Sequence, residues 1–190
     1  MAHAMQTGMH FHAESGLLRG ACQVLSPHCD PRPGGAVPEL IVVHGISLPP
    51  GEYGGPWIGQ LFCGALDPAV HPYFAEVAAL RVSAHLLVRR DGEVLQFVPV
   101  GLRAWHAGRS SWQGREGCND FSVGIELEGS DVQPYAAAQY AALAQLVRAL
   151  CATWPTLSPH RLVGHSDIAP GRKTDPGPSF DWDRLRALLG

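Results

Sequence analysis

The sequence has no apolar run long enough to cross a membrane and no excess of positive charge. A membrane-spanning helix needs about 18 or more uninterrupted apolar residues, and no stretch of the 190 residues approaches that length. The 14 Lys and Arg residues are outnumbered by 17 Asp and Glu residues, and the two signs are mixed along the chain. Because no broad positive field can form, we expect no membrane span and no nucleic-acid partner.

Paired cysteines and an export signal are also missing. The cysteines are odd in number and lack C-x-x-C spacing, which favours free thiols in a reducing compartment. They are Cys22, Cys29, Cys63, Cys118 and Cys151. The chain begins without the basic segment and apolar core that direct export. We therefore expect a soluble cytoplasmic protein.

The sequence does contain enough apolar residues for one domain. Hydrophobic residues make up 46% of the 190 residues, which suffices for one sizeable core. The opening residues show no periodicity, so residues 1–25 are expected to form a partly flexible N-terminal extension with His3, His10 and His12 exposed to solvent. Residues 26–190 are expected to form the functional domain, and we expect a monomer.

Short apolar segments alternate with helical patterns along the rest of the chain. Strands interleaved with helices predict an α/β (α+β) domain in which helices flank a central mixed β-sheet. Strands are predicted at 40–43, 83–89, 93–98, 121–128 and 162–164, with a two-residue turn at Asp91 and Gly92. Helices are predicted at 56–66, 134–154 and 182–189, the last capped by Asp181. Residues 166–180 are rich in turn formers and are expected to be irregular.

Three residues have the chemistry of a catalytic zinc site. His44 and His165 each follow a short apolar strand, in IVVH and LVGH, and this placement can bring them together at one sheet edge. Asp175 lies in the irregular loop after His165. Imidazole nitrogens and carboxylate oxygens are zinc ligands, and a catalytic site uses three of them and leaves a fourth position for water. The alternative is that His44 caps its strand and His165 bonds to a backbone carbonyl.

A carboxylate beside such a metal can take a proton from an attacking water molecule. Glu126 lies on the polar face of the predicted strand 121–128, whose other face carries Val123, Ile125 and Leu127. Glu128 shares the face of Glu126. The pattern alone therefore does not choose between the two carboxylates, and either one is equally consistent with a solvated strand residue.

Other polar and aromatic side chains are candidates for contacts with a substrate. Lys173, just before Asp175, can stabilise the negative charge that amide hydrolysis builds on the carbonyl oxygen, or it is an ordinary solvated lysine. Arg81 and Arg109 offer guanidinium groups to peptide carboxylates, and Trp105 offers an aromatic face to a sugar ring or packs in the core. The remaining histidines of the domain are interpreted as structural or surface residues: His28, His71, His85, His106 and His160.

Several longer stretches, in this order, resemble the AmpD branch of the N-acetylmuramoyl-L-alanine amidases, relatives of phage lysozyme amidases and of peptidoglycan recognition proteins. They are VVHGISLPPGEYGGPWI, DPAVHPYF, LRVSAHLLVRRDGEVLQFVP, RAWHAGRSSWQGREGCNDFSVGIELEG and GHSDIAPGRKTDPGPSFDW. The resemblance spans residues 26–188. It implies a mixed sheet flanked by helices and a zinc-dependent hydrolase of muropeptides. The bond cleaved joins the lactyl group of 1,6-anhydro-N-acetylmuramic acid to L-alanine, in cytoplasmic cell-wall recycling.

The resemblance also implies roles for the residues singled out above. The zinc ligands that it implies are His44, His165 and Asp175. The catalytic base is Glu126, and the residue that stabilises the oxyanion is Lys173. Positions near the bound muropeptide are Tyr73, Arg81 and Trp105. The chain departs from the family at Gly45, where Asn is usual and where a substrate-facing amide is therefore missing, and at Gly117, where some relatives carry a bulkier or basic residue.

Two other functions fit the same resemblance. A peptidoglycan-binding module that has lost catalysis would lack a ligand, whereas all three ligand positions are filled in this chain. An amidase that acts on intact peptidoglycan outside the cell would ordinarily carry an export signal or a lipid-anchor cysteine near its start, and neither is apparent.

Overall fold

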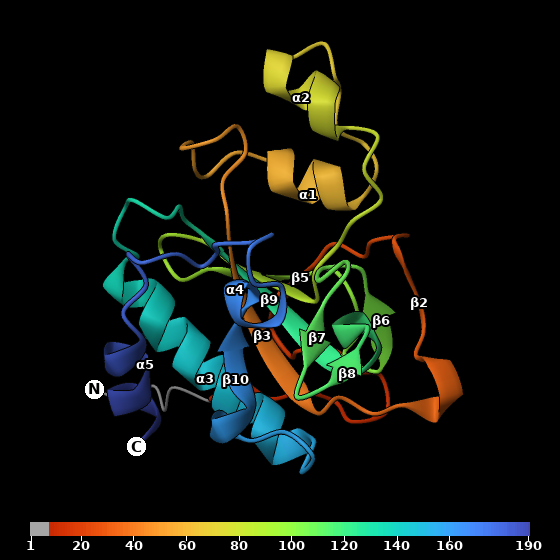
Figure 1. Cartoon of the computed structure of the whole chain (residues 1–190), viewed down its shortest axis with the longest axis vertical. Helices are drawn as coiled ribbons and strands as arrows, with labels where there is room; N and C mark the ends of the chain where they lie inside the picture. Colours follow the sequence, from red (N-terminus) through yellow and green to blue (C-terminus); the bar gives the residue numbers. More distant parts are fainter. Residues whose placement is uncertain (1–7) are drawn as a thin grey trace, which may run out of the picture.

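A computed structural model describes residues 8–190 and shows a layered α/β domain. Helices α3 (Ala137–Thr153) and α5 (Trp182–Leu189) lie side by side against one face of a central sheet, whereas α1 (Trp57–Phe62) and α2 (Pro72–Val77) form a separate group at the top of the view in Figure 1. This arrangement confirms the predicted single domain with a mixed sheet flanked by helices.

The central sheet has six strands in the order β1-β5-β4-β9-β3-β10. All neighbouring strands are parallel except β4 and β5, which form a hairpin. The strands are β1 (Cys22–Gln23), β3 (Leu40–Ile46), β4 (Leu86–Val88), β5 (Val94–Gln96), β9 (Ser122–Glu128) and β10 (Leu162–Gly164). Two small sheets pair β2 (Cys29–Pro31) with β6 (Leu102–Ala104) and β7 (Ser111–Trp112) with β8 (Arg115–Glu116).

The alternation in β9 divides the two faces of the sheet. Val123, Ile125 and Leu127 are fully buried in the core that also contains the inner side chains of α3 and α5. Burying one such side chain contributes about 1.5–3 kcal/mol to folding. The sequence pattern allowed the residues of the opposite face to be exposed to solvent, but that face is buried too. It carries Ser122, Gly124, Glu126 and Glu128. Its polar side chains therefore need partners or a function.

Helix α3 is tied to the sheet by one buried glutamine. Gln139 Oε1 accepts a hydrogen bond from Ala136 N at the start of the helix, at 2.9 Å. Its Nε2 atom donates to Val88 O and Glu128 O, the last carbonyls of β4 and β9. The helix ends at Thr153, shortly before Pro155, which cannot continue it. The prediction of a helix here is confirmed, and so is that of α5 with Asp181 as its N-cap.

Two predicted elements differ in length from expectation at glycines with positive φ. The helix predicted at 56–66 ends at Phe62, since Gly64, at φ +68°, lets Ala65 N turn back to Gln60 O and close the helix. The hairpin between β4 and β5 is confirmed, but its loop has three residues, Arg90 to Gly92, instead of two. Gly92 at φ +90° is the left-handed residue of that loop type.

Other local predictions need correction around the histidines. Strand β3 does not stop at His44 but runs to Ile46, because β9 pairs with it as far as Glu128. The segment 166–180 is irregular only after Ile168, since α4 (His165–Ile168) forms one helical turn. The Asp167 carboxylate accepts from Gly164 N at 2.7 Å and so caps that turn.

The described part of the N-terminal extension packs against the domain. Phe11 and Leu18 are buried in the core beneath α3, and β1 adds a strand beside β5. His10 and His12 are exposed, as predicted, whereas His3 lies outside the described residues. The domain boundary at residue 26 stays a prediction.

None of the five cysteines, which all lie within residues 8–190, is in a disulfide in the structure. Within residues 8–190, no helix combines the length and the apolar character that a bilayer crossing demands.

Buried His85 is expected to make folding sensitive to acid. Burial, and then the charge of Arg32, lower the pKa of His85 to about 3. In the unfolded chain a histidine takes up a proton near pH 6.5. The folded pKa lies below the unfolded one, so the stabilisation is complete above about pH 6.5 and is lost as the pH falls, by up to about 1.4 kcal/mol per pH unit.

Urea unfolding of the metal-free protein at about pH 7, 6 and 5 tests this expectation. His85→Gln is the comparison variant, because an amide can still accept from Gly124 N and donate to Leu102 O, the two backbone partners of the imidazole. On acidification the free energy of unfolding of the variant should fall less steeply than that of the wild type. The difference in slope should correspond to about one proton fewer taken up on unfolding. Equal slopes for the two proteins would contradict the assignment.

Candidate functional site

Three neighbouring strands deliver the predicted histidines and glutamate to one edge of the sheet. In β3 and β9, His44 pairs with Glu126 across the parallel ladder. In β10, Gly164 pairs with Val43, so His165 follows directly beside His44. The loop after α4 returns to this edge through a hydrogen bond from Ser166 N to Asp175 O at 3.0 Å. The sequence-predicted residues therefore meet on the face of the sheet that α3 does not cover.

His44, His165 and Asp175 direct three donor atoms at one point. The two Nδ1 atoms are 3.0 Å apart, His165 Nδ1 is 3.0 Å from Asp175 Oδ2, and His44 Nδ1 is 3.3 Å from the same oxygen. Zinc bonds of about 2.1 Å at tetrahedral angles separate neighbouring ligand atoms by about 3.4 Å. The triangle thus has nearly the size of one face of a zinc coordination sphere, and these residues could hold a metal ion.

The ionisation of these groups also suits metal ligation. Burial lowers the pKa of His44 to about 4, although its hydrogen bond with Asp175 acts in the opposite direction. Burial opposes ionisation of Asp175, but the hydrogen bonds from His165 and His44 outweigh it and hold its pKa below the usual range. A neutral imidazole and an ionised carboxylate are the forms that bind metal ions.

The structure distinguishes the two glutamates that the strand pattern left equivalent. Glu128 is 1% exposed and fully engaged: it accepts hydrogen bonds from Gly54 N, Arg89 Nη1 and Arg90 N at 2.9–3.1 Å. Glu126 is 9% exposed, and its Oε2 atom is buried without a partner in the described residues. Burial, and then the negative charge of Asp175, raise the pKa of Glu126 well above its usual value. Glu126 is therefore the carboxylate that is free to exchange a proton.

A cavity of about 430 Å³ opens over these groups. The three clustered residues and Glu126 form part of its wall, and Lys173 also lines it. Lys173 is exposed, and its positive charge acts on both Glu126 and His44. The cavity thus combines a candidate metal site, a carboxylate and a cation.

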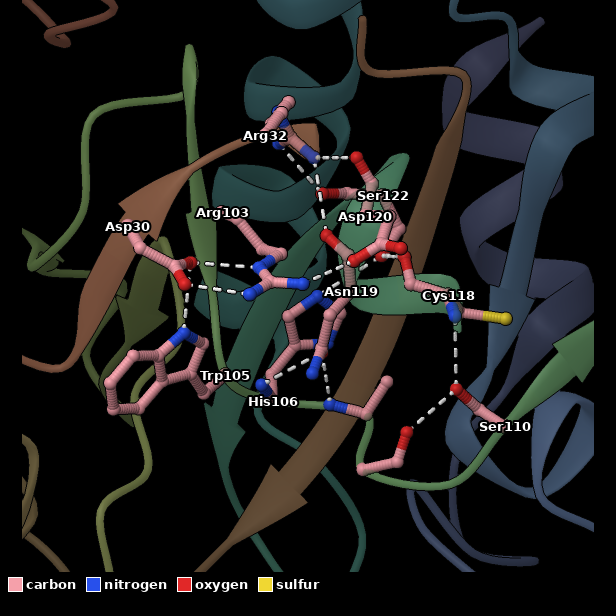
Figure 2. A network of polar contacts seen from close by, with 12 residues as sticks. Asp30, Arg32, Arg103, Trp105, His106, Ser110, Cys118, Asn119, Asp120 and Ser122 are labelled. Atoms are coloured by element: carbon pink, nitrogen blue, oxygen red, sulfur yellow. Dashed lines mark hydrogen bonds and ion pairs between the residues drawn. The ribbon is translucent and has the colours of Figure 1, made fainter. Parts of the chain in front are cut away.

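Two of the residues predicted to contact a substrate, one tyrosine and one tryptophan, line this cavity. Tyr73 reaches it from α2, and Trp105 forms another part of its wall. Figure 2 shows how Trp105 is held. Its Nε1 atom donates to Asp30 at 3.1 Å, and Asp30 also accepts from the Nε and Nη2 atoms of Arg103. Trp105 therefore presents a fixed ring to the cavity.

The two arginines are placed differently. The guanidinium carbon of Arg81 lies 5.5 Å from the centroid of the Trp105 ring, so Arg81 flanks the tryptophan without lining the cavity itself. Arg109 lies beside a separate hollow that it shares with Arg172.

His106 is a member of the site that the sequence interpretation did not single out. It lines the cavity, and its Nδ1 atom lies 2.9 Å from His44 Nε2. Its spacing in RAWHAG carries no signal for this position. An indirect signal was Gly124 inside β9, because a glycine in a strand often marks the close approach of another group. The other histidines interpreted as structural or surface residues are not part of the cavity wall: His28, His71, His85 and His160.

Gly45, where the family resemblance led us to expect Asn, also lies in the wall. A Cβ atom at this position would collide with the Tyr135 hydroxyl, which donates to Pro176 O at 2.9 Å. Tyr135 thus fills the space that a side chain at position 45 would take. At Gly117, φ is +72°, a left-handed conformation that favours glycine over the bulkier residues of some relatives.

Comparisons with known proteins agree with this geometry. The chain matches the N-acetylmuramoyl-L-alanine amidase family over residues 34–178. It is 61% identical to the 1,6-anhydro-N-acetylmuramyl-L-alanine amidase AmpD of Escherichia coli (strain K12), over 93% of this chain and 96% of the relative.

Solved structures show the same similarity. A crystal structure of an AmpD selenomethionine derivative superposes with a TM-score of 0.90 at 60% identity and covers 93% of this chain and 98% of that one. The amidase AmiD from E. coli, in complex with anhydro-N-acetylmuramic acid-L-Ala-D-γ-Glu-L-Lys, has a TM-score of 0.58 at 29% identity and covers 95% of this chain and 65% of that one.

Proposed function

Since the chain belongs to the N-acetylmuramoyl-L-alanine amidase family, we propose that it hydrolyses the amide bond between the lactyl group of 1,6-anhydro-N-acetylmuramic acid and L-alanine in muropeptides. The near full-length similarity to AmpD supports the anhydro-sugar substrate. The observation that carries the hydrolytic function is the convergence of His44 Nδ1, His165 Nδ1 and Asp175 Oδ2 beside the unpaired Oε2 of Glu126. We further place the reaction in cytoplasmic cell-wall recycling by a monomer, and the unpaired cysteines support a reducing compartment.

The cofactor in this proposal is Zn²⁺, held by His44, His165 and Asp175. The donor set fits it: two neutral imidazole nitrogens and one carboxylate oxygen form the three-ligand set of a catalytic zinc site. When bound there, zinc supplies a Lewis acid that polarises the scissile carbonyl and acidifies a water molecule.

The proton transfers are assigned to Glu126. Its carboxylate accepts a proton from the water molecule as the water oxygen bonds to the lactyl carbonyl carbon. It then returns that proton to the alanine nitrogen as the carbon–nitrogen bond breaks, which leaves a free carboxylic acid on the sugar and a free amine on the peptide. Burial raises the pKa of Glu126, so its carboxyl group can hold the proton between the two transfers.

Charge and orientation are assigned to other groups of the cavity. The Lys173 ammonium stabilises the carbonyl oxygen while it is negative. We assign to the muropeptide the part of the cavity wall that is lined by Tyr73 and by Trp105, whose ring is fixed by Asp30. Arg81 flanks Trp105, where a carboxylate of the peptide can reach its guanidinium group.

The two alternatives from the sequence are distinguished from this proposal in different ways. A binding module without catalysis has no use for a buried carboxylate without a partner, because leaving such a group unpaired costs free energy. An amidase acting on intact peptidoglycan has the same chemistry, so the substrate test below separates it from our proposal.

A product assay tests the proposal directly. Purified protein is incubated with anhydro-muramyl tripeptide, untreated, after chelation, and after chelation followed by zinc, and the products are read by mass spectrometry. We expect free tripeptide in the first and third samples and none in the second. Intact peptidoglycan serves as the parallel substrate. Cleavage of peptidoglycan alone would overturn the assignment of the anhydro-muropeptide, and cleavage of neither by zinc-loaded protein would overturn the amidase function.

A further inference from the structure

The imidazole of His44 faces two different groups with its two nitrogens. Nδ1 points to His165 and Asp175, whereas Nε2 lies 2.9 Å from His106 Nδ1. A neutral imidazole carries one proton, and the nitrogen that binds a metal must be the unprotonated one. If Nδ1 of His44 is the ligand, Nε2 carries the proton, and His106 Nδ1 must accept it.

The partners of His106 force it into that accepting form. Ser122 Oγ lies 2.5 Å from Cys118 O, a backbone carbonyl that can only accept, so the serine hydroxyl donates its proton there. The serine oxygen is then left to accept from His106 Nε2, at 3.1 Å. Because its proton is on Nε2, His106 has a free lone pair on Nδ1. The chain of donors therefore runs in one direction only, from His44 through His106 and Ser122 to the Cys118 carbonyl.

The side chains of Asn119 and Arg32 fix the backbone around His106 and Ser122, as Figure 2 shows. Asn119 Oδ1 accepts from the backbone N–H groups of His106 and Ala107, at 3.1 and 2.7 Å. The buried guanidinium of Arg32 donates to Ser122 O at 2.9 Å and to Asp120 O at 3.0 Å. The segment before β9 and the loop that carries His106 are thus fixed relative to each other.

Strand β9 also makes room for the imidazole. A Cβ atom at Gly124 would lie 2.6 Å from His106 Nδ1, too close for any side chain. Ser122, Gly124 and Glu126 are every second residue of the strand and therefore share one of its faces. One face of β9 therefore supplies the acceptor for His106, the space for its ring and the proposed catalytic base.

We propose that His106 is a positioning residue which, through Ser122, fixes His44 in the tautomer that offers Nδ1 to the metal ion. The inference rests on the proposed function, because it takes His44 as a ligand. Outer partners of ligating histidines typically change metal affinity by about 10–100-fold when they are removed. His106 does not touch the reacting atoms in this assignment and acts only through His44.

Zinc affinity, measured by competition with a fluorescent chelator and without substrate, is the first readout. We expect His106→Leu to weaken zinc binding by about 10–100-fold. His106→Gln should stay within a few-fold of the wild type, because its amide oxygen can accept the proton of His44 Nε2. His160→Leu, at an exposed histidine outside the cavity, is the matched control and should change nothing. Wild-type zinc affinity in a folded His106→Leu protein would overturn the proposal.

Ser122→Ala is the second variant, and it leaves both histidines in place. Without the hydroxyl, nothing holds the proton on His106 Nε2, so the ring can present an N–H to His44 instead of a lone pair. Nitrogen-15 NMR of the imidazoles should show the Nε2–H form of His106 in the wild type and a mixture in the variant, with zinc binding weaker by several-fold. Ser110→Ala is the matched control, since Ser110 bonds to Cys118 N in the same network but does not touch a histidine.

These outcomes also separate a positioning role from a purely structural one. A purely structural role would lower the free energy of unfolding of metal-free His106→Leu but leave the zinc affinity of its folded fraction unchanged. It would also predict no tautomer change in Ser122→Ala. An unchanged zinc affinity in the first variant or an unchanged tautomer in the second would overturn the proposal. Because these readouts use no substrate, they are independent of the product assay that tests the amidase function.

Discussion

Glu126→Gln is expected to lower kcat by about 10²–10⁴-fold while zinc remains bound. The amide is nearly the same size as the carboxylate but cannot accept a proton, so the attacking water keeps its proton and the alanine nitrogen receives none. Zinc should stay bound because Glu126 Oε1 is 4.0 Å from His44 Nδ1, outside the triangle of donor atoms. Turnover of anhydro-muramyl tripeptide and the zinc content of the same preparation are the two measurements.

Glu128→Gln is the matched control for that prediction. It changes the same group on the same face of β9, but Glu128 is paired with Arg89 and accepts from two backbone N–H groups. Its loss should lower the stability by about 2 kcal/mol, measured by urea unfolding, and should leave kcat within a few-fold of the wild type. If Glu128→Gln were inactive and Glu126→Gln active, the roles of the two glutamates would be reversed.

The contrast between these glutamates shows where sequence reasoning reaches its limit. Alternation in FSVGIELE predicts correctly that both carboxylates share one face of a strand. It cannot show that the Arg89 guanidinium, on the neighbouring hairpin, pairs with Glu128, and that the backbone N–H of Arg90 also donates to that carboxylate. That distinction depends on contacts between residues almost 40 positions apart in the chain.

The meeting of His44 and His165 was predictable for a physical reason. Each follows a short apolar segment, and adjacent parallel strands end at the same edge of a sheet. The adjacency and the parallel direction of β3 and β10 had to be assumed. Asp175 was a candidate because of its ligand chemistry, and the resemblance to a known family supported it. It lies in a loop whose irregular course no periodicity describes, and the structure places it 3.0 Å from His165.

His106 was not predictable in the same way. It lies in no apolar strand, and its neighbours Asn119 and Ser122 belong to other parts of the chain. The features that define its environment are a serine hydroxyl, a backbone carbonyl and the missing side chain of Gly124. The short strands β1, β2, β6, β7 and β8 escaped prediction for a related reason, since two or three residues are too few to show alternation.

Asp175→Asn is expected to weaken zinc binding by about 100-fold or more and to lower turnover in parallel. Loss of an outer partner already costs about 10–100-fold, and this substitution removes the negative charge of a proposed ligand itself. In the folded protein, hydrogen bonds from His165 and His44 hold the pKa of Asp175 below its usual range against the effect of burial. The site is therefore built for the ionised carboxylate, and a neutral amide oxygen at the same place attracts the metal ion far less.

Asp167→Asn is the control, because Asp167 lies in the same segment as Asp175 but caps the first turn of α4 through Gly164 N. It should leave zinc affinity unchanged and change the stability little, because the amide oxygen of Asn can still accept from Gly164 N. Excess zinc should restore part of the activity of Asp175→Asn, since His44 and His165 still supply two nitrogens, whereas it cannot rescue Glu126→Gln, whose defect is proton transfer. Rescue by zinc in one variant and not in the other assigns Asp175 to the metal and Glu126 to the proton. A stoichiometric, tightly bound zinc in Asp175→Asn would instead remove Asp175 from the ligand set.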